Sequence, residues 1–319
     1  MVETGVTVSR RHQDGGHMDP IKVFVMAILQ GVTELFPVSS LGHMVIISGL
    51  LQWNDTLQSP TFLPLLVMLH LGTSVALLTF FWRDWVALLR GGMRTVIAGR
   101  FSPDVDPDGA GRQLALVVVG TIPAGIVGLL FQHILEKGFS IPILASAFLV
   151  ANGAVLLAGE RLWRRQRMQE KLVKEQAPQF GEIGRSINDM TFKQAVIIGG
   201  AQMFALIPGF SRSGLTMVAG MANGLSHEAS ARFSFLLATP IIVAAGALEV
   251  PKLLKAQYLP ELPIAVAGGV VAGIAAYLSV RFLMRYFETN RLDPFAYYCV
   301  IAGTLTFAYF ALQFFHVIP

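Results

Sequence analysis

The chain has 319 residues, of which 54% are hydrophobic and only 14% are charged, and its mean hydropathy is +0.59. A soluble domain carries about 25% charged residues, so this composition excludes a soluble globular protein and requires lipid to cover part of the surface. The net charge of +4 is uninformative alone, because the position of the basic residues is what matters in a membrane protein. The single cysteine, Cys299, excludes an internal disulfide and a cysteine-based metal site.

The N-terminal residues 1–17 are polar, and no apolar stretch typical of a cleaved signal peptide follows them. We expect these residues to be a polar extension outside the fold, with Met18 as a candidate native start. The elements of the fold are therefore sought from residue 18 onward.

Two regions are apolar but interrupted by polar residues and proline. The first is Ile21–Leu51, broken around Pro37, and the second is Ala195–Gly224, broken around Pro208. The apolar pieces beside each break are too short to cross a bilayer, which takes about 20 residues. Non-helical backbone at membrane depth is tolerated only inside protein or beside a water-filled cavity. Each region is therefore predicted to be a re-entrant helical hairpin.

Six other stretches are long and apolar enough to cross a bilayer. They predict six transmembrane helices in an all-α integral membrane protein. In chain order they are Phe62–Trp82, Leu114–Gln132, Pro142–Gly159, Ser234–Val250, Leu262–Val280 and Phe295–Phe315.

The order of these elements repeats, because each broken hairpin is followed by three spans. Three crossings are an odd number and a re-entrant hairpin adds none, so the second half must enter the membrane from the opposite side. This order predicts an inverted-topology repeat, whose site commonly lies near the midplane between the halves. The predicted boundaries are 18–160 for the first repeat, 161–192 for a connector and 193–319 for the second repeat.

Most of the 24 lysines and arginines lie in three loops that this topology places on one side. These are the loop after the first span, with Arg83, Arg90 and Arg94, the connector 161–192, and the loop before the last span. The positive-inside rule makes that side the cytoplasm and places the N-terminus outside. The connector is predicted to be solvated and part-helical, and no nucleic-acid partner is expected because aromatic residues do not accompany its charge.

The second break contains an arginine at membrane depth, which is a functional-site hypothesis by default. Arg212 follows Pro208 and Gly209, which interrupt the helix, and a new helix can begin at this point. An arginine fork, hydroxyl groups and a helix N-terminus together predict an anion site, for which phosphate is the best ligand. The alternative is that Arg212 pairs with a carboxylate and only holds the two halves together. The hydroxyls are those of Ser211, Ser213 and Thr216.

The first break carries a second set of polar side chains. Gln30 and Glu34 are four residues apart, share a helix face, and could hold Mg²⁺ or Ca²⁺ through oxygen ligands. Ser40 and His43 share a face if a helix starts near Ser39, which suits a base beside a hydroxyl nucleophile or a bound water. Taken singly, each of these residues is more often a packing partner. Their clustering opposite Arg212 favours function.

Other polar residues have simpler interpretations. His70, within a span, is expected to make a buried hydrogen bond more often than to serve a site. His227 and Glu228 are expected near a helix start, and Arg232 is expected to extend its charge toward the membrane surface. The aromatic residues of Phe295–Phe315 are interpreted as lipid-facing or interfacial.

Two patterns resemble those of the undecaprenyl-diphosphate phosphatase family, also called the bacitracin-resistance proteins. The first runs from Gln30-x-x-x-Glu34 into Pro37-Val38-Ser39-Ser40-x-Gly42-His43. The second is Pro208-Gly209-x-Ser211-Arg212-Ser213-x-x-Thr216. The resemblance covers the chain from about Met18 to the C-terminus, and the two patterns in this order are highly specific.

The resemblance implies a multi-pass enzyme of the bacterial plasma membrane that hydrolyses undecaprenyl diphosphate to the monophosphate. This reaction recycles the carrier lipid for peptidoglycan synthesis and gives bacitracin resistance. The family uses a divalent cation, and its site is thought to open to the periplasm. The matched positions imply catalytic roles for Glu34, Ser40, His43 and Arg212. Further matches around the diphosphate are Gln30, Ser39, Gly209, Ser211, Ser213 and Thr216.

In the mechanism that these matches suggest, Arg212 and backbone N–H groups hold the phosphates and a cation on Glu34 neutralises charge. Ser40, or a water held beside it, attacks, and His43 relays the proton. Many family members have Glu where this chain has Gln30, so metal affinity here is expected to be weaker.

Two alternatives from other classes remain. An inverted repeat with broken helices also fits a transporter or flippase of a phosphorylated polyprenyl lipid. A channel-like or structural protein would leave Arg212, Glu34 and His43 without a purpose. The other membrane phosphatase pattern, Ser-Arg-x5-His-x3-Asp, is rejected because Val218 stands where it requires His. A homodimer, the prenyl chain length and the preferred cation are left open.

Overall fold

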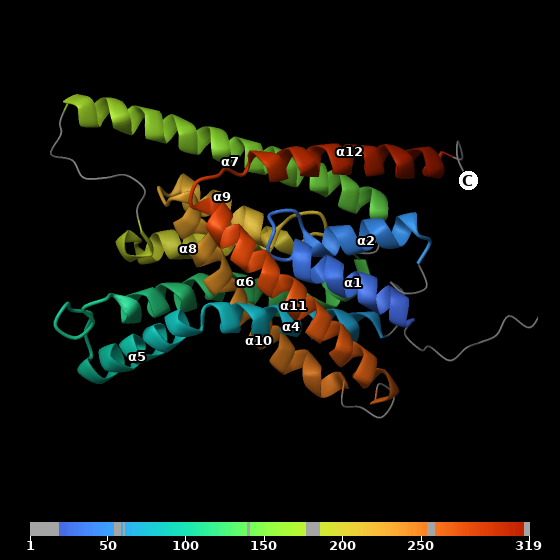
Figure 1. The fold of residues 1–319 in the computed structure, drawn as a ribbon, viewed down its shortest axis with the longest axis horizontal. Coiled ribbons are helices and arrows are strands. Elements are labelled where there is room, and N and C mark those ends of the chain that lie inside the picture. The colour runs from blue at the N-terminus through green and yellow to red at the C-terminus, as the bar shows by residue number, and fades with distance from the viewer. Residues whose placement is uncertain are drawn as a thin grey trace, which may run out of the picture.

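The computed structural model describes residues 19–53, 59, 61–138, 141–176, 186–253 and 259–315 (Figure 1). The predicted extension 1–17 and part of the connector lie outside these residues. Within the described ranges every regular element is helical, which confirms the all-α class. The longer helices are α4 (Phe62–Phe80), α5 (Trp82–Ala98), α6 (Ala110–Gly138), α7 (Pro142–Gln176), α10 (His227–Leu253), α11 (Leu262–Phe287) and α12 (Asp293–Phe314).

Five of these helices, α6, α7, α10, α11 and α12, are each long and apolar enough to cross a membrane. The sixth predicted span corresponds to α4, which passes the same test only together with α5. The chain is thus a multi-pass membrane protein. Several boundaries differ from the sequence prediction. Helix α7 continues to Gln176 into the predicted connector, α10 begins at His227 rather than at Ser234, and α11 ends at Phe287 rather than at Val280. Helix α6 is also longer than predicted at both ends.

Helix α5 is a correction, because the sequence analysis placed its residues in a loop. It turns by 77° from α4 and ends at Gly99, whose φ of 67° provides a left-handed cap. Its buried face contains Leu88, Gly91 and Gly92 and packs against α6. The arginines that suggested a solvated loop occupy only one side of the helix, so they do not prevent the opposite side from packing.

The two predicted breaks are present. Helices α1 (Pro20–Thr33) and α2 (Ser40–Leu50) flank the first. The second lies between α8 (Phe192–Gly200), followed by the 3₁₀ helix η2 (Ala201–Leu206), and α9 (Arg212–Ala222). The helix after each break starts in the same way, because a serine hydroxyl caps it by accepting the backbone N–H three residues later in the chain. In α2 the Ser39 hydroxyl accepts the N–H of Gly42 at 3.2 Å, and in α9 the Ser211 hydroxyl accepts the N–H of Gly214 at 3.1 Å. Re-entrant insertion and the inverted repeat remain predictions.

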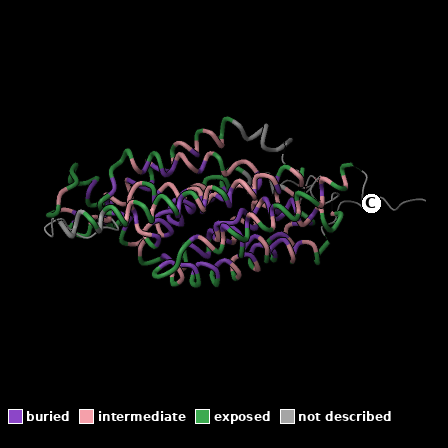
Figure 2. Tube along the Cα trace, turned by 90° about the horizontal axis from the view of Figure 1, so that it is seen from above, coloured by how far each residue is buried: buried purple, intermediate pink, exposed green. Residues whose placement is uncertain are grey.

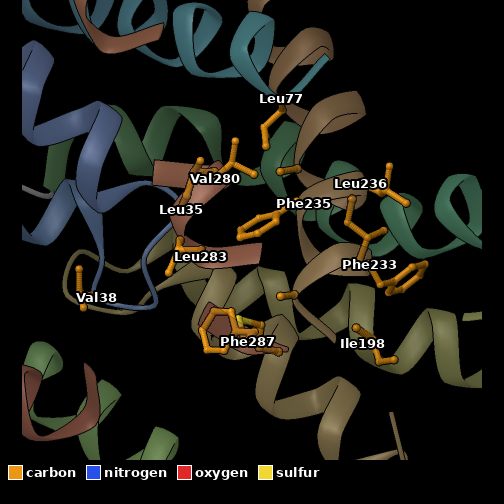
Figure 3. Close-up of a cluster of buried hydrophobic side chains, with 14 of the residues drawn as sticks. Leu35, Val38, Leu77, Ile198, Phe233, Phe235, Leu236, Val280, Leu283 and Phe287 are labelled. Atoms are coloured by element: carbon orange, nitrogen blue, oxygen red, sulfur yellow. The ribbon is translucent and has the colours of Figure 1, made fainter. Parts of the chain in front are cut away.

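Both halves contribute to one core. Helix α12 lies alongside α7, and α11 packs against α4 and α1 (Figure 1). The burial pattern places the most buried residues along the middle of the bundle and the exposed ones on its outside (Figure 2). Around Phe235 of α10 gather Leu35 from the first break, Leu77 of α4, Ile198 of α8 and Leu283 of α11 (Figure 3). This cluster fixes the two breaks against each other.

Two helices approach each other closely at a pair of glycines. A Cβ atom on Gly199 of α8 would lie 1.7 Å from the carbonyl oxygen of Gly120 on α6. Membrane helices use small residues in this way to bring their backbones together. The contact joins the second broken hairpin to the first half of the chain.

We expect Gly199→Val to lower the melting temperature of the detergent-solubilised protein strongly or to prevent its folding. Overpacking costs about 1–3 kcal/mol where side chains can shift, and more where a backbone atom is the obstacle. Gly125→Val on α6 is the control, because nothing lies within 4 Å of its added Cβ. Equal melting temperatures for the two variants would contradict this packing.

Candidate active site

The two breaks meet. The Ser39 hydroxyl, which caps α2, also accepts the backbone N–H of Gly209 from the second break at 3.2 Å. A Cβ on Gly42 would lie 2.8 Å from the Cα of Gly209, so the two loops touch through their backbones. The N-termini of α2 and α9 thereby come together, and both carry the partial positive charge of a helix start.

The backbone at this contact is strained. Ser39 has a φ of 72°, a region that a residue with a side chain rarely adopts. Gly209 has a φ of 106°, and a Cβ there would lie 2.4 Å from the carbonyl oxygen of Ala145. Such strain concentrates at functional sites, where the surrounding structure holds it in place.

Glu34 is the centre of the side-chain cluster, and its side chain is only 6% exposed. Its Oε1 atom pairs with a guanidinium nitrogen of Arg212. Its Oε2 atom accepts the Ser40 hydroxyl at 2.5 Å and the Gln30 amide at 2.9 Å. The Nε2 atom of His70 lies 3.4 Å from the same oxygen. The alternative of an arginine–carboxylate pair between the halves is thus present in the resting protein.

Two polar atoms of this cluster are buried without a partner. They are the Nη1 atom of Arg212 and the Oε1 atom of Gln30. An unsatisfied buried polar group costs about 1–3 kcal/mol, so it calls for an explanation. One is a donor with positive charge and the other an oxygen acceptor. The cluster can therefore receive an anion at Arg212 and a cation at Gln30 and Glu34.

Asn152 of α7 ties the breaks together, a role that the sequence analysis missed. Its amide donates to the carbonyl of Pro37 at 2.9 Å, and its Oδ1 accepts the N–H of Ser211 at 3.0 Å. The Ser213 hydroxyl adds a bond to the carbonyl of Phe36 at 3.0 Å. The sequence feature that could have revealed this role is an amide side chain in the middle of a predicted span.

The expected pairing of His43 with Ser40 is not formed. The Nδ1 atom of His43 lies 2.6 Å from the carbonyl of Ser39, and its Nε2 lies 2.8 Å from the hydroxyl of Tyr298. A carbonyl can only accept, so Nδ1 carries the hydrogen and Nε2 accepts the hydroxyl of Tyr298. Ser40 instead donates to Glu34. The position at which α2 starts directs His43 toward α12. The three-residue spacing between Ser40 and His43 does not reveal this direction.

Several other interpretations change as well. Arg232 pairs with Asp84 of α5, and His227 bonds the buried Glu160 at 2.8 Å. Thr216 donates to its own helix and meets the Ser234 hydroxyl at 2.6 Å, so in this state it does not reach the cluster around Glu34. His227 and Glu228 do open a helix, as predicted.

We expect nitrogen-15 NMR of histidine-labelled protein at neutral pH to show His43 as the Nδ1–H tautomer. The signals of His43 are identified as those that disappear from the spectrum of His43→Asn. Tyr298→Phe removes the donor to Nε2 and should shift that nitrogen while leaving Nδ1 protonated. An Nε2–H signal from His43 in the unmodified protein would contradict the assignment.

Known proteins match this chain over nearly its whole length. The family model described as "Bacitracin resistance protein BacA" matches residues 23–305. The protein called "Undecaprenyl-diphosphatase 2" of Burkholderia lata is 49% identical over 289 residues, covering 90% of this chain and 96% of the relative. The protein called "Undecaprenyl-diphosphatase" of Acidiphilium cryptum is 46% identical over 296 residues, covering 91% and 97%. One of the same name from Granulibacter bethesdensis is 48% identical over 290 residues, covering 90% and 95%. The family model spans both breaks and ends within α12, and together with these relatives it shows that the chain belongs to the bacitracin resistance protein family.

Proposed function

We propose that the chain hydrolyses undecaprenyl diphosphate to undecaprenyl phosphate and inorganic phosphate. This activity recycles the carrier lipid for peptidoglycan synthesis and confers bacitracin resistance. The observation that carries the proposal is the buried cluster in which Arg212 has one unpartnered nitrogen while Ser40 donates to Glu34. Relatives covering nine-tenths of the chain carry the name of that activity.

Arg212 is the main phosphate ligand in this proposal. It is the first residue of α9, so its charge and the free N–H groups of the first turn act on the same anion. A phosphate that binds its unpartnered nitrogen also competes with Glu34 for the rest of the guanidinium. Ser39, Gly209, Ser211 and Ser213 shape the surrounding loops through the hydrogen bonds between the breaks.

Glu34 is the base. The Ser40 oxygen attacks the terminal phosphorus as its proton passes to Glu34, and the bond to the bridging oxygen breaks to release undecaprenyl phosphate. Water then attacks the phosphoserine and loses one proton to solvent, and the bond between the Ser40 oxygen and phosphorus breaks to give inorganic phosphate. Glu34 returns its proton to the Ser40 oxygen. A water held beside Ser40 could replace the first step with direct attack. His43 supports Ser39 rather than relaying this proton, because both of its ring nitrogens are occupied elsewhere.

The oxygen ligands fit a hard divalent cation such as Mg²⁺ or Ca²⁺ only if the substrate supplies some of them. The unpartnered Oε1 of Gln30 and the carboxylate of Glu34 lie on the same helix end. Among the described residues no group of three His, Cys, Asp or Glu side chains is placed to hold a metal. A bound cation would neutralise charge on the diphosphate. We propose that Gln30 and Glu34 hold it together with phosphate oxygens.

The proposed location is the bacterial inner membrane, with the site open to the periplasm. The support is the charge distribution, since the arginine-rich α5 and the C-terminal part of α7 lie in helical connections between spans that parity places on the opposite side.

Phosphate release from undecaprenyl diphosphate by the purified protein tests the function directly. We expect Arg212→Ala and Glu34→Gln each to lower kcat/KM at least about 100-fold, since they remove charge stabilisation and the base. Arg165→Ala, on the exposed part of α7, is the control and should retain activity. No release by folded protein supplied with lipid would reject the phosphatase and favour the transporter.

A second experiment separates the two nucleophiles. We expect protein quenched in acid during turnover of terminally ³²P-labelled substrate to carry label on Ser40, and Ser40→Ala to lose both label and activity by at least about 100-fold. Ser48→Ala, on the same helix, is the control. Retained activity in Ser40→Ala would assign the attack to water.

A further inference from the structure

His70 of α4 is the one side chain of the Glu34 cluster without an assigned role. Its Nδ1 atom lies 2.8 Å from the carbonyl of Leu66, one turn earlier in its own helix. Because a carbonyl only accepts, Nδ1 carries a hydrogen and points along the helix. This bond fixes the ring and directs Nε2 toward Glu34, 3.4 Å away.

The contact gives the Glu34 carboxylate a second fixed point. His70 of α4 reaches Oε2, the oxygen that also accepts the Ser40 hydroxyl, while Arg212 of α9 pairs with Oε1. Glu34 is thus held from two sides by side chains of different helices.

The two side chains differ in their freedom. Arg212 has an unpartnered nitrogen and must turn toward the diphosphate if it binds phosphate as proposed. Glu34 then loses the contact at Oε1, and its direction depends on the groups that stay at Oε2. His70 is tied to Leu66 and contacts the oxygen that also accepts Ser40. It can stay on Glu34 while Arg212 leaves.

We propose that His70 is a positioning residue that keeps Glu34 directed at Ser40 while Arg212 engages the diphosphate. The proposal rests on the proposed function. It requires that the His70 side chain act through Glu34, rather than only fill space between helices. A glutamine at this position would keep a donor, whereas a leucine would keep the volume alone.

Kinetics of His70→Leu and His70→Gln test the role. We expect His70→Leu to lower kcat about 10–100-fold, as loss of a partner behind a catalytic group does, with KM changed much less. His70→Gln should recover most of this loss. Two outcomes overturn the proposal: equal activity of His70→Leu and the unmodified protein, or equal loss in both variants.

A measurement without substrate tests the contact itself. The melting temperatures of His70→Leu, Glu34→Gln and the double variant form a cycle, and we expect the double variant to differ clearly from the sum of the single shifts. Additive shifts would show that His70 does not act through Glu34. Coupling in a protein that releases no phosphate would instead overturn the proposed function and leave the contact intact.

An independent observation concerns the surface of α5. Beside its buried face, the helix exposes an apolar face formed by Trp82, Leu89, Met93, Val96 and Ile97. A third face carries Arg83, Arg90 and Arg94, whose spacings of seven and four residues place them in one row. Within the described part of the chain, Arg90 and Arg94 are exposed and have no side-chain partner. Arg83 stacks on the Trp82 ring, 5.4 Å from its centroid, so Arg90 and Arg94 are the members of the row that are available to a partner. An apolar face beside exposed arginines is typical of a helix at a lipid interface.

We infer that this row binds the headgroups of anionic phospholipids while the apolar face contacts their acyl chains. Charge complementarity supports this partner, since arginines near a membrane surface attract acidic lipids. The 77° bend from α4 and the pair between Asp84 and Arg232 hold the helix in a fixed orientation.

Brominated lipids can report on α5 because Trp82 belongs to its apolar face. In phosphatidylcholine nanodiscs, a minor fraction of brominated phosphatidylglycerol should quench Trp82 at least about twofold more than the same fraction of brominated phosphatidylcholine. Trp82→Phe isolates this signal. The excess quenching by phosphatidylglycerol should disappear in the double variant Arg90→Gln/Arg94→Gln. It should persist in the control double variant Arg161→Gln/Arg165→Gln. Equal quenching by the two lipids, or an excess that survives Arg90→Gln/Arg94→Gln, would overturn the inference.

Discussion

The ion pair between Arg212 and Glu34 is the interaction on which the rest of the structure depends. Its partners are 178 residues apart in the chain, one in each half, and both are largely buried. A buried ion pair contributes little to stability relative to well-packed apolar residues, because removing two charges from water is costly. The pair is therefore better explained by a ligand that replaces one partner than by a need for stability. The unpartnered nitrogen of Arg212 supports the same explanation.

The broken helices follow from this requirement. A continuous helix satisfies its own backbone groups and offers none to a ligand, whereas a helix that starts inside the protein presents free N–H groups. Part of each break is satisfied within the protein, since Ser39 and Ser211 accept the N–H groups of Gly42 and Gly214, and Asn152 accepts the N–H of Ser211. The strained backbone of Ser39 is held by these contacts. The breaks are thus built as one unit, although they lie in separate halves.

The sequence was sufficient to predict the long apolar helices and both breaks, because length, apolarity and proline act locally. It was also sufficient to predict that Glu34 and Arg212 share a site, since charges at membrane depth need partners. It could not predict which side chains join them. The rotation of α4 decides that His70 faces Glu34, and the start of α2 decides that His43 faces Tyr298. Helix α5 was missed because its packing depends on Gly91 and Gly92 meeting α6, while its composition resembles a loop.

The resting pair also bears on how a catalytic cycle would end. While diphosphate is bound, Arg212 and Glu34 are separated, and on our proposal His70 keeps Glu34 directed at Ser40. Hydrolysis divides the negative charge between two products, so each holds Arg212 less strongly than the intact diphosphate does. Glu34 stays at the end of α1 and remains a competitor for the guanidinium. Re-formation of the pair would therefore favour release of phosphate, so the interaction that closes the empty site would also clear it after each turnover.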